Sequence, residues 1–145
     1  MMKKYEFTGE TKMWLGRKLH RIKAAWDFDD VKCGDLGGWI EKEDNLSHDG
    51  SCFVYGDARV YGNARVYGNA DISKSEHYIC IGPIGSRNDF TTFFKSKDGK
   101  IMVACGCFRG DIDRFAEKVH ETHEGNKHEK VYLAACELAK LQIEV

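Results

Sequence analysis

A glycine-containing loop in the second half of the chain holds the side chains best suited to binding an anionic ligand. The loop spans residues 82–89 and reads Gly-Pro-Ile-Gly-Ser-Arg-Asn-Asp. Its glycines let the backbone approach a ligand closely, Arg87 can hold a phosphate through two parallel hydrogen bonds, and Asn88 can read the edge of a base or ribose. A purely structural turn, in which Arg87 pairs with Asp89, accounts for the same residues.

A second turn, over residues 107–111, adds a cation beside the predicted start of a helix. Arg109 precedes a helix N-terminus that would attract anions, unless this arginine pairs with Asp111. Two phenylalanines lie near the two turns and could stack on a base. The residues predicted to bind a ligand are Arg87, Asn88, Phe90, Phe108 and Arg109.

A zinc site is an alternative in the same region. Cys105 and Cys107 lie two apart on a predicted strand, and His120 and His123 lie three apart on a predicted helix, so each pair shares a face. A Cys-x-Cys pair is unusual for zinc, and cysteines on a buried strand commonly pack as small apolar residues. We therefore expect no metal and no other cofactor. No catalytic set of serine, cysteine, histidine and carboxylate side chains is recognisable, which favours a protein that is not an enzyme.

Strands and helices of the C-terminal half must position these residues. Aromatic and β-branched residues predict three strands, at residues 78–81, 90–96 and 101–108. Asp111 can cap a first helix, Gly125 can end it, and a second helix is predicted over residues 127–141. The C-terminal half is thus predicted to be a β-hairpin with a preceding strand, followed by two helices.

A six-residue repeat fills the middle of the chain. Three near-identical hexads, Val-Tyr-Gly-Asp/Asn-Ala-Arg/Asp, cover residues 54–71, and a degraded fourth follows at 72–77. A period of six fits neither a helix nor a flat strand, but it is typical of a parallel β-helix with valine and alanine pointing inward. We therefore predict an α+β chain: a short β-helix stub within residues 1–77, and the hairpin with two helices within residues 78–145.

The outward positions of the repeat predict an interface between copies of the chain. Tyrosine recurs at the second position and arginine at the sixth, and repeated exposed aromatic residues are typical of an interaction surface. Closed symmetry then favours a trimer or a trimer of dimers. The residues predicted at this interface are Tyr55, Tyr61, Tyr67, Arg59 and Arg65.

Composition excludes several classes of function. The 145 residues carry 22 basic and 23 acidic side chains, a net charge of −1, so binding to a nucleic-acid polymer is disfavoured. No apolar run is long enough to cross a membrane, and the first residues do not resemble a signal peptide. Six cysteines occur without a Cys-x-x-Cys pair, which fits reduced thiols. We therefore expect a cytoplasmic protein.

The chain resembles small prophage-encoded proteins with hexapeptide repeats. The resemblance rests on the hexads together with residues 37–39, 84–89 and 105–108. The C-terminal half is also similar to phage Thoeris anti-defence sponges, which bind cyclic nucleotide signals without turning them over and assemble as trimers of dimers. This resemblance implies a location in the cytoplasm of the host cell.

Three functions follow as expectations from these observations. The first is a phage or prophage anti-defence protein that sequesters a signalling nucleotide, either a cyclic ADP-ribose isomer or a cyclic oligonucleotide. The second is a protein that inhibits a host defence factor by direct contact through its repeat face. The third is a hexapeptide acyltransferase, for which His48 and His77 flank the repeat but a single coil offers no long groove.

Overall fold

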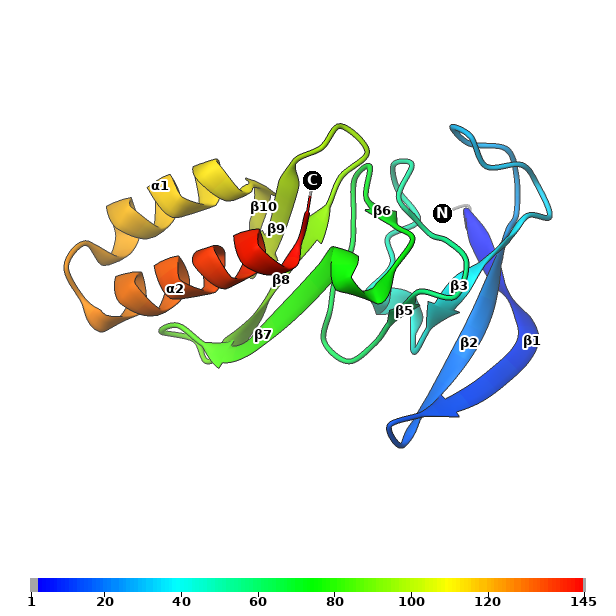
Figure 1. Ribbon diagram of the computed structural model, residues 1–145, viewed down its shortest axis with the longest axis horizontal. Coiled ribbons are helices and arrows are strands. Elements are labelled where there is room, and N and C mark those ends of the chain that lie inside the picture. Colours follow the sequence, from blue (N-terminus) through cyan, green and yellow to red (C-terminus); the bar gives the residue numbers. More distant parts are fainter. Residues whose placement is uncertain (1–2, 145) are drawn as a thin grey trace. The chain divides into compact units, whose positions relative to one another are not determined.

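The computed structural model describes residues 3–144 (Figure 1), which form ten strands, two α-helices and two short 3-10 helices. The chain divides into two compact units, residues 1–75 and 76–145, here called the N-terminal and C-terminal units. The hexads lie in the N-terminal unit. The loop and turn predicted to bind a ligand lie in the C-terminal unit.

The N-terminal unit contains a four-stranded sheet and a separate pair of short strands. The sheet has the order β1-β2-β3-β5, in which the first two pairs are antiparallel and the β3–β5 pair is parallel. Its strands are β1 (Tyr5–Trp14), β2 (Arg17–Ala24), β3 (Leu36–Ile40) and β5 (Arg59–Val60). The second, parallel pair consists of β4 (Phe53–Val54) and β6 (Asp71–Ile72).

The hexads bury the residues that their spacing predicts. The first positions, from Val54 to Ile72, are at most 1% exposed, and the three alanines at the fifth position are at most 3% exposed. The repeat glycines have positive φ values, from 60° at Gly56 to 69° at Gly62, a region that glycine adopts at little cost. The predicted inward and bending positions of the repeat are therefore confirmed.

The predicted β-helix stub is wrong. Strands β4, β5 and β6 are each two residues long and belong to two different sheets, and Val66 contributes only a single bridge with Leu46. Within residues 3–144 no sheet closes or winds as a solenoid. The reason is that a bend every six residues leaves little extended chain for pairing, and the period fixes which residues are buried without fixing which strands pair. The α+β class itself agrees with the structure.

The C-terminal unit is an antiparallel sheet packed against two helices. Its strands have the order β10-β9-β8-β7, and the helices follow the last strand in sequence. The elements are β7 (Tyr78–Ile84), β8 (Asp89–Lys95), β9 (Ile101–Cys105), β10 (Phe108–Asp111), α1 (Ile112–His123) and α2 (Lys127–Gln142). Phe93 and Val103 of the sheet meet Phe115 of α1 and Ala139 of α2 in one buried core. The predicted strand over 101–108 is split, because a turn at Gly106 folds β10 back onto β9.

Polar side chains fix the ends of both helices. The carboxylate of Asp111 accepts a hydrogen bond from the backbone N–H of Arg114 at 2.9 Å. The side chain of Asn126 caps α2 by accepting from the amides of His128 and Glu129. A helix needs about 20 apolar residues to cross a bilayer. Helices α1 and α2 have 12 and 16 residues, so neither of these helices of residues 3–144 could cross one.

Candidate ligand-binding pocket

The C-terminal unit contains a pocket of about 270 Å³ between its sheet and its helices. The turn between β7 and β8 contributes Arg87, and the turn between β9 and β10 contributes Phe108. Helix α1 adds Lys118 and His123, and α2 adds Tyr132. The two turns that the sequence singles out therefore meet at one cavity.

The β7–β8 turn is tight, and this geometry places Arg87 at the pocket. The carbonyl of Gly85 accepts a hydrogen bond from the amide of Asn88 at 3.2 Å, and both residues have positive φ, 80° and 50°. A Cβ atom at position 85 would overlap the hydroxyl of Tyr132. Glycine thus serves two purposes here: it permits the turn, and it leaves room for the tyrosine that lines the pocket.

Aromatic rings form the apolar wall of the pocket. Phe115 lies between two of them, with ring centroids 5.3 Å from Phe108 and 5.6 Å from Tyr132. The ring of His123 stacks on that of Tyr132, with centroids 5.9 Å apart and an interplanar angle of 26°. Such rings offer flat apolar surface on which another aromatic group can stack.

The polar lining of the pocket is mainly cationic. The lining contains the cations Arg87 and Lys118. Asp89 is the single carboxylate among the lining residues. Asp89 accepts a hydrogen bond from the neighbouring amide of Phe90 at 2.7 Å. Arg87 forms no ion pair with any carboxylate among residues 3–144, so its guanidinium does not have the purely structural pairing with Asp89 that the sequence left open.

The hydroxyl of Tyr132 stays protonated at neutral pH. Burial, and next the neighbouring Cys105, raise the pKa of Tyr132 to about 12, although Arg87 acts in the opposite direction. The Sγ atom of Cys105 lies 4.0 Å from this hydroxyl and accepts a hydrogen bond from the hydroxyl of Thr91 at 3.2 Å. Tyr132 is therefore a hydrogen-bond donor for a ligand rather than a base.

Two of the five predicted ligand-binding residues line the pocket and three do not. Arg87 and Phe108 line it. Asn88 is exposed in the turn, and the ring of Phe90 covers Gly82 on β7.

Arg109 lies outside the pocket lining and closes its own turn. Its Nη1 atom donates to the carbonyls of Gly106 at 2.9 Å and Phe108 at 2.7 Å. Sequence reasoning missed Lys118 and Tyr132. Lys118 could have been found, because residues 115, 118, 119 and 122 share one face of a helix.

The four metal candidates do not assemble into a metal site. Cys105, Cys107 and His123 line the pocket, but His120 is elsewhere, with its Nδ1 atom 2.6 Å from the carboxylate of Glu129. Within residues 3–144 no three His, Cys, Asp or Glu side chains are grouped as ligands for a metal ion.

Two of the three tyrosines predicted to form an oligomer interface, Tyr55 and Tyr61, make contacts within their own unit. The hydroxyl of Tyr55 donates to Asp30 at 3.1 Å. The guanidinium of Arg17 lies 5.6 Å from the ring of Tyr61. All three tyrosines of the repeat are half-buried, so their role between copies of the chain stays a prediction.

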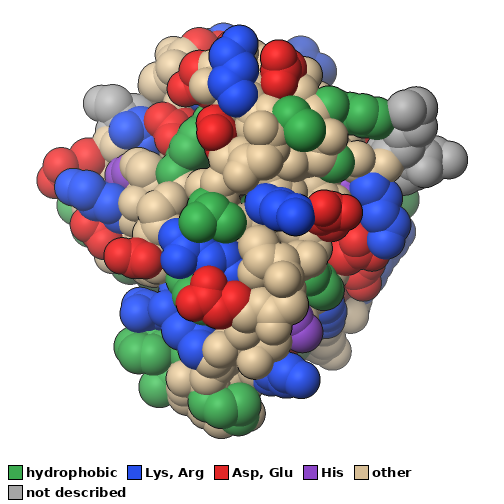
Figure 2. Space-filling model, turned by 90° about the vertical axis from the view of Figure 1, so that its right-hand side faces the viewer, with side chains coloured by type: hydrophobic (Ala, Val, Ile, Leu, Met, Phe, Trp, Pro, Cys, Tyr) green, Lys and Arg blue, Asp and Glu red, His purple; other side chains and the backbone are tan. Residues whose placement is uncertain are grey.

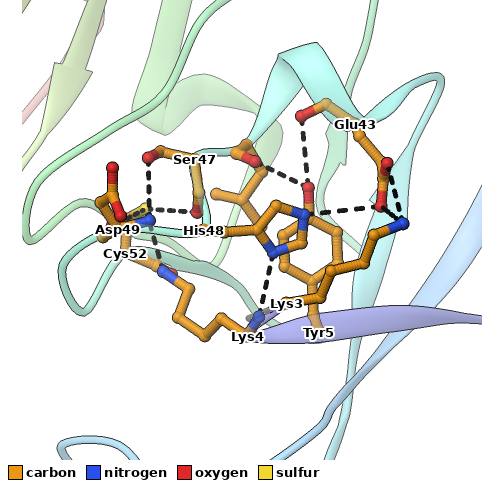
Figure 3. A network of polar contacts seen from close by, with 9 residues as sticks. Lys3, Lys4, Tyr5, Glu43, Ser47, His48, Asp49 and Cys52 are labelled. Atoms are coloured by element: carbon orange, nitrogen blue, oxygen red, sulfur yellow. Dashed lines mark hydrogen bonds and ion pairs between the residues drawn. The ribbon is translucent and has the colours of Figure 1, made fainter. Parts of the chain in front are cut away.

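A polar network in the N-terminal unit joins the start of β1 to the loop over residues 43–52 (Figure 3). The Nζ atom of Lys4 is buried and donates to the carbonyl of Cys52 at 2.6 Å. The amide of Lys4 donates to Nδ1 of His48 at 3.0 Å, and the ring of Tyr5 stacks on His48 at 4.1 Å. The other ring nitrogen of His48 lies 3.4 Å from the carboxylate of Glu43. His48 therefore has a structural role in this network. His77 lies in the short 3-10 helix over Ser75–His77.

We expect His48 and His120 to titrate on opposite sides of their ordinary pKa of 6.5. Burial lowers the pKa of His48, whereas Glu129 raises the pKa of the exposed His120. The stability that comes from neutral His48 is complete above pH 6.5 and is lost as the pH falls from 6.5 through the lowered pKa. Stability from charged His120 is complete below pH 6.5 and is lost as the pH rises through the raised pKa.

Titration of the imidazole proton resonances by NMR measures both pKa values. Unfolding in urea between pH 8 and pH 5, followed by tryptophan fluorescence, measures the effect of His48, because all three tryptophans belong to the N-terminal unit. His48→Gln should flatten this pH dependence. A His48 pKa at or above 6.5 would contradict the burial seen here.

Comparison with known proteins gives a short match. No family model matches the chain. A segment of 37 residues, 26% of the chain, is 46% identical to the uncharacterized acetyltransferase YdcK of Escherichia coli strain K12. The match covers 11% of that relative's length, so it concerns a small part of both proteins.

Proposed function

We propose that this chain is a binding protein that holds a small anionic ligand with an aromatic ring, such as a signalling nucleotide, in the pocket of the C-terminal unit. One observation carries the proposal. The cationic side chains of Arg87 and Lys118 stand beside the rings of Phe108 and Tyr132 in a single cavity.

Each part of this lining suits one part of a nucleotide. A guanidinium holds a phosphate through two parallel, charge-assisted hydrogen bonds, and Arg87 has no carboxylate partner within residues 3–144 to displace. Phe108 supplies a ring for stacking on a base. The protonated hydroxyl of Tyr132 can donate to a ribose or phosphate oxygen.

The size of the cavity favours a compact ligand. Small-molecule pockets usually enclose about 300–1,000 Å³, so 270 Å³ lies just below that range. A ligand with a single base, such as a mononucleotide or a cyclic ADP-ribose isomer, suits this volume better than a cyclic oligonucleotide does.

Sequestration rather than turnover is the proposed outcome of binding. A general base works best with a pKa near the operating pH, whereas the pKa of Tyr132 is about 12. An anti-defence role for this binding rests on the similarity of the C-terminal β-hairpin and its two helices to phage Thoeris anti-defence sponges.

The Arg87→Gln variant is expected to bind the nucleotide at least about tenfold more weakly, because it removes a charge-assisted hydrogen bond. Calorimetry with cyclic ADP-ribose isomers, mononucleotides and cyclic dinucleotides measures the affinity. Arg114→Gln is the matched control, since Arg114 is exposed on α1 and lies outside the pocket lining, and its affinity should stay within about twofold of the parent. A folded protein that binds none of these compounds would remove the proposal.

Acyl transfer is a second candidate, favoured by the 37-residue match to a protein named as an acetyltransferase. The test is turnover of acetyl-CoA in the presence of small amines and alcohols. Release of free coenzyme A above the background rate would support this candidate, and its absence at high protein concentration would dismiss it.

A further inference from the structure

Three cations gather around two indole rings on one face of the N-terminal sheet. Directly opposite residues on paired strands share a face, and the register places Arg21 opposite Trp39 and Trp39 opposite Arg59. Lys12 joins them from β1, with its Nζ atom 4.1 Å from the centre of the Trp39 ring. The guanidinium of Arg59 lies 4.1 Å from the ring of Trp14. These five residues, Lys12, Trp14, Arg21, Trp39 and Arg59, are here called the basic–aromatic cluster.

Carboxylates compensate this charge only in part. Within residues 3–144 one ion pair reaches the cluster, between Arg21 and Glu10 at 3.8 Å, and neither Lys12 nor Arg59 has one. Burial, and next the positive charge of Arg59, lower the pKa of Lys12, while Asp57 raises it. The cations are therefore close enough to repel one another.

Two donors in the cluster lack an acceptor. Trp39 is 4% exposed, and its indole N–H has no hydrogen-bond partner among the described residues. Lys12 and Arg21 both lie near its ring, 4.1 Å and 5.6 Å from the centroid. The Nε–H of Arg59 is buried without a partner as well. A buried donor without an acceptor costs about 1–3 kcal/mol. The cluster thus offers positive charge and two N–H groups without an acceptor oxygen among the described residues.

We propose that the basic–aromatic cluster is a second ligand site, which binds a phosphate-type oxyanion carried by a small molecule. Arg59 donates N–H groups to the anion, Lys12 supplies a point charge, and the indole of Trp39 donates a further hydrogen bond. This ligand relieves the repulsion among the three cations, and it reaches the two buried donors when the side chains of Lys12 and Arg59 shift. Trp14 covers the guanidinium of Arg59 and holds it in place.

A small ligand fits this surface better than a nucleic-acid polymer does. Figure 2 faces the β1–β2 side of the N-terminal unit, where Lys and Arg side chains alternate with Asp, Glu and hydrophobic ones. A surface of this kind lacks the continuous positive stripe that follows a polymer backbone. The net charge of −1 points the same way.

The indole N–H resonances of the three tryptophans provide the test. The intact protein is titrated with inorganic phosphate, pyrophosphate and a short oligothymidylate, each against sodium chloride of matched ionic strength. We expect saturable shifts at Trp39 and Trp14, and an unmoved Trp26, which lies outside the cluster. The peaks are assigned from Trp14→Phe and Trp39→Phe.

Arg59→Gln is expected to lower the affinity read from these shifts at least about tenfold, because charge-assisted hydrogen bonds are lost. Arg65→Gln is the matched control, because Arg65 holds the same position in the next hexad, and it should leave the titration unchanged. Thermal unfolding shows whether both variants are folded. If Arg59→Gln is not folded, the same titration is carried out with Lys12→Gln.

The order of affinities identifies the source of the phosphate. Tighter binding of pyrophosphate than of oligothymidylate supports the small-molecule site, and the reverse order would overturn it in favour of a nucleic-acid backbone. A Trp39 resonance that none of the three probes moves, or that moves equally in Arg59→Gln, would overturn the site altogether. Either result leaves nucleotide binding in the C-terminal unit to its own test.

Discussion

Replacement of Gly38 by alanine is expected to cost about 3 kcal/mol or more and to unfold most of the N-terminal unit. A Cβ atom at this position would lie 2.5 Å from the carbonyl oxygen of Ala58 and 2.7 Å from Cγ1 of Val54. The Ala58 carbonyl accepts a hydrogen bond from the backbone amide of Trp39. It cannot move without breaking this hydrogen bond between β3 and the repeat. A unit of about 75 residues has little stability to spare.

Urea unfolding followed by tryptophan fluorescence measures this loss in the N-terminal unit alone. Gly9→Ala is the control, since Gly9 lies in β1 of the same four-stranded sheet but a Cβ atom there meets nothing within 4 Å. Its positive φ of 93° should cost only about 1–2 kcal/mol. Equal stability of Gly38→Ala and the parent protein would show that the repeat does not pack on β3 as described.

The side chains that the hexads bury could be predicted, but the partners of their strands could not. The type and spacing of Val54, Ala58 and Val60 determine which side of the chain is apolar, and this is a local property. Strand pairing depends on segments far apart in the sequence. Trp39 and Arg59 are 20 residues apart and meet only because β3 and β5 pair. For this reason the basic–aromatic cluster was not predictable from the sequence.

The candidate pocket shows the same division between local and tertiary information. Arg87 and Phe108 could be named from turn chemistry, because each lies in a short segment with a readable conformation. Tyr132 comes from α2, and only the packing of α2 against α1 and the β7–β8 turn brings it to the pocket. Arg109 has the right chemistry, but its hydrogen bonds to nearby carbonyls take it out of the lining.

Gly85→Ala is expected to distort the pocket and to destabilise the C-terminal unit by about 2–4 kcal/mol. An added Cβ atom would overlap the hydroxyl of Tyr132 and lie 2.5 Å from its ring carbon Cζ, in a backbone conformation with φ of 80°. The ring cannot swing away freely, because Phe115 and His123 pack on it. We therefore expect the β7–β8 turn to move outward, and the affinity for a nucleotide to fall at least about tenfold as Arg87 leaves its place.

A double-mutant cycle with Tyr132→Phe isolates the overlap. Removal of the hydroxyl takes away the nearest atom, so Gly85→Ala should cost less in the Tyr132→Phe background than in the parent, by about 1 kcal/mol. Gly99→Ala is the control for backbone strain, because Gly99 has a similar φ of 75° and open space around it. Circular dichroism of the helices during urea unfolding follows this unit, since α1 and α2 both belong to it. An equal cost of Gly85→Ala in both backgrounds, matching that of Gly99→Ala, would show that Tyr132 does not pack over Gly85 and that the pocket is not closed in this way.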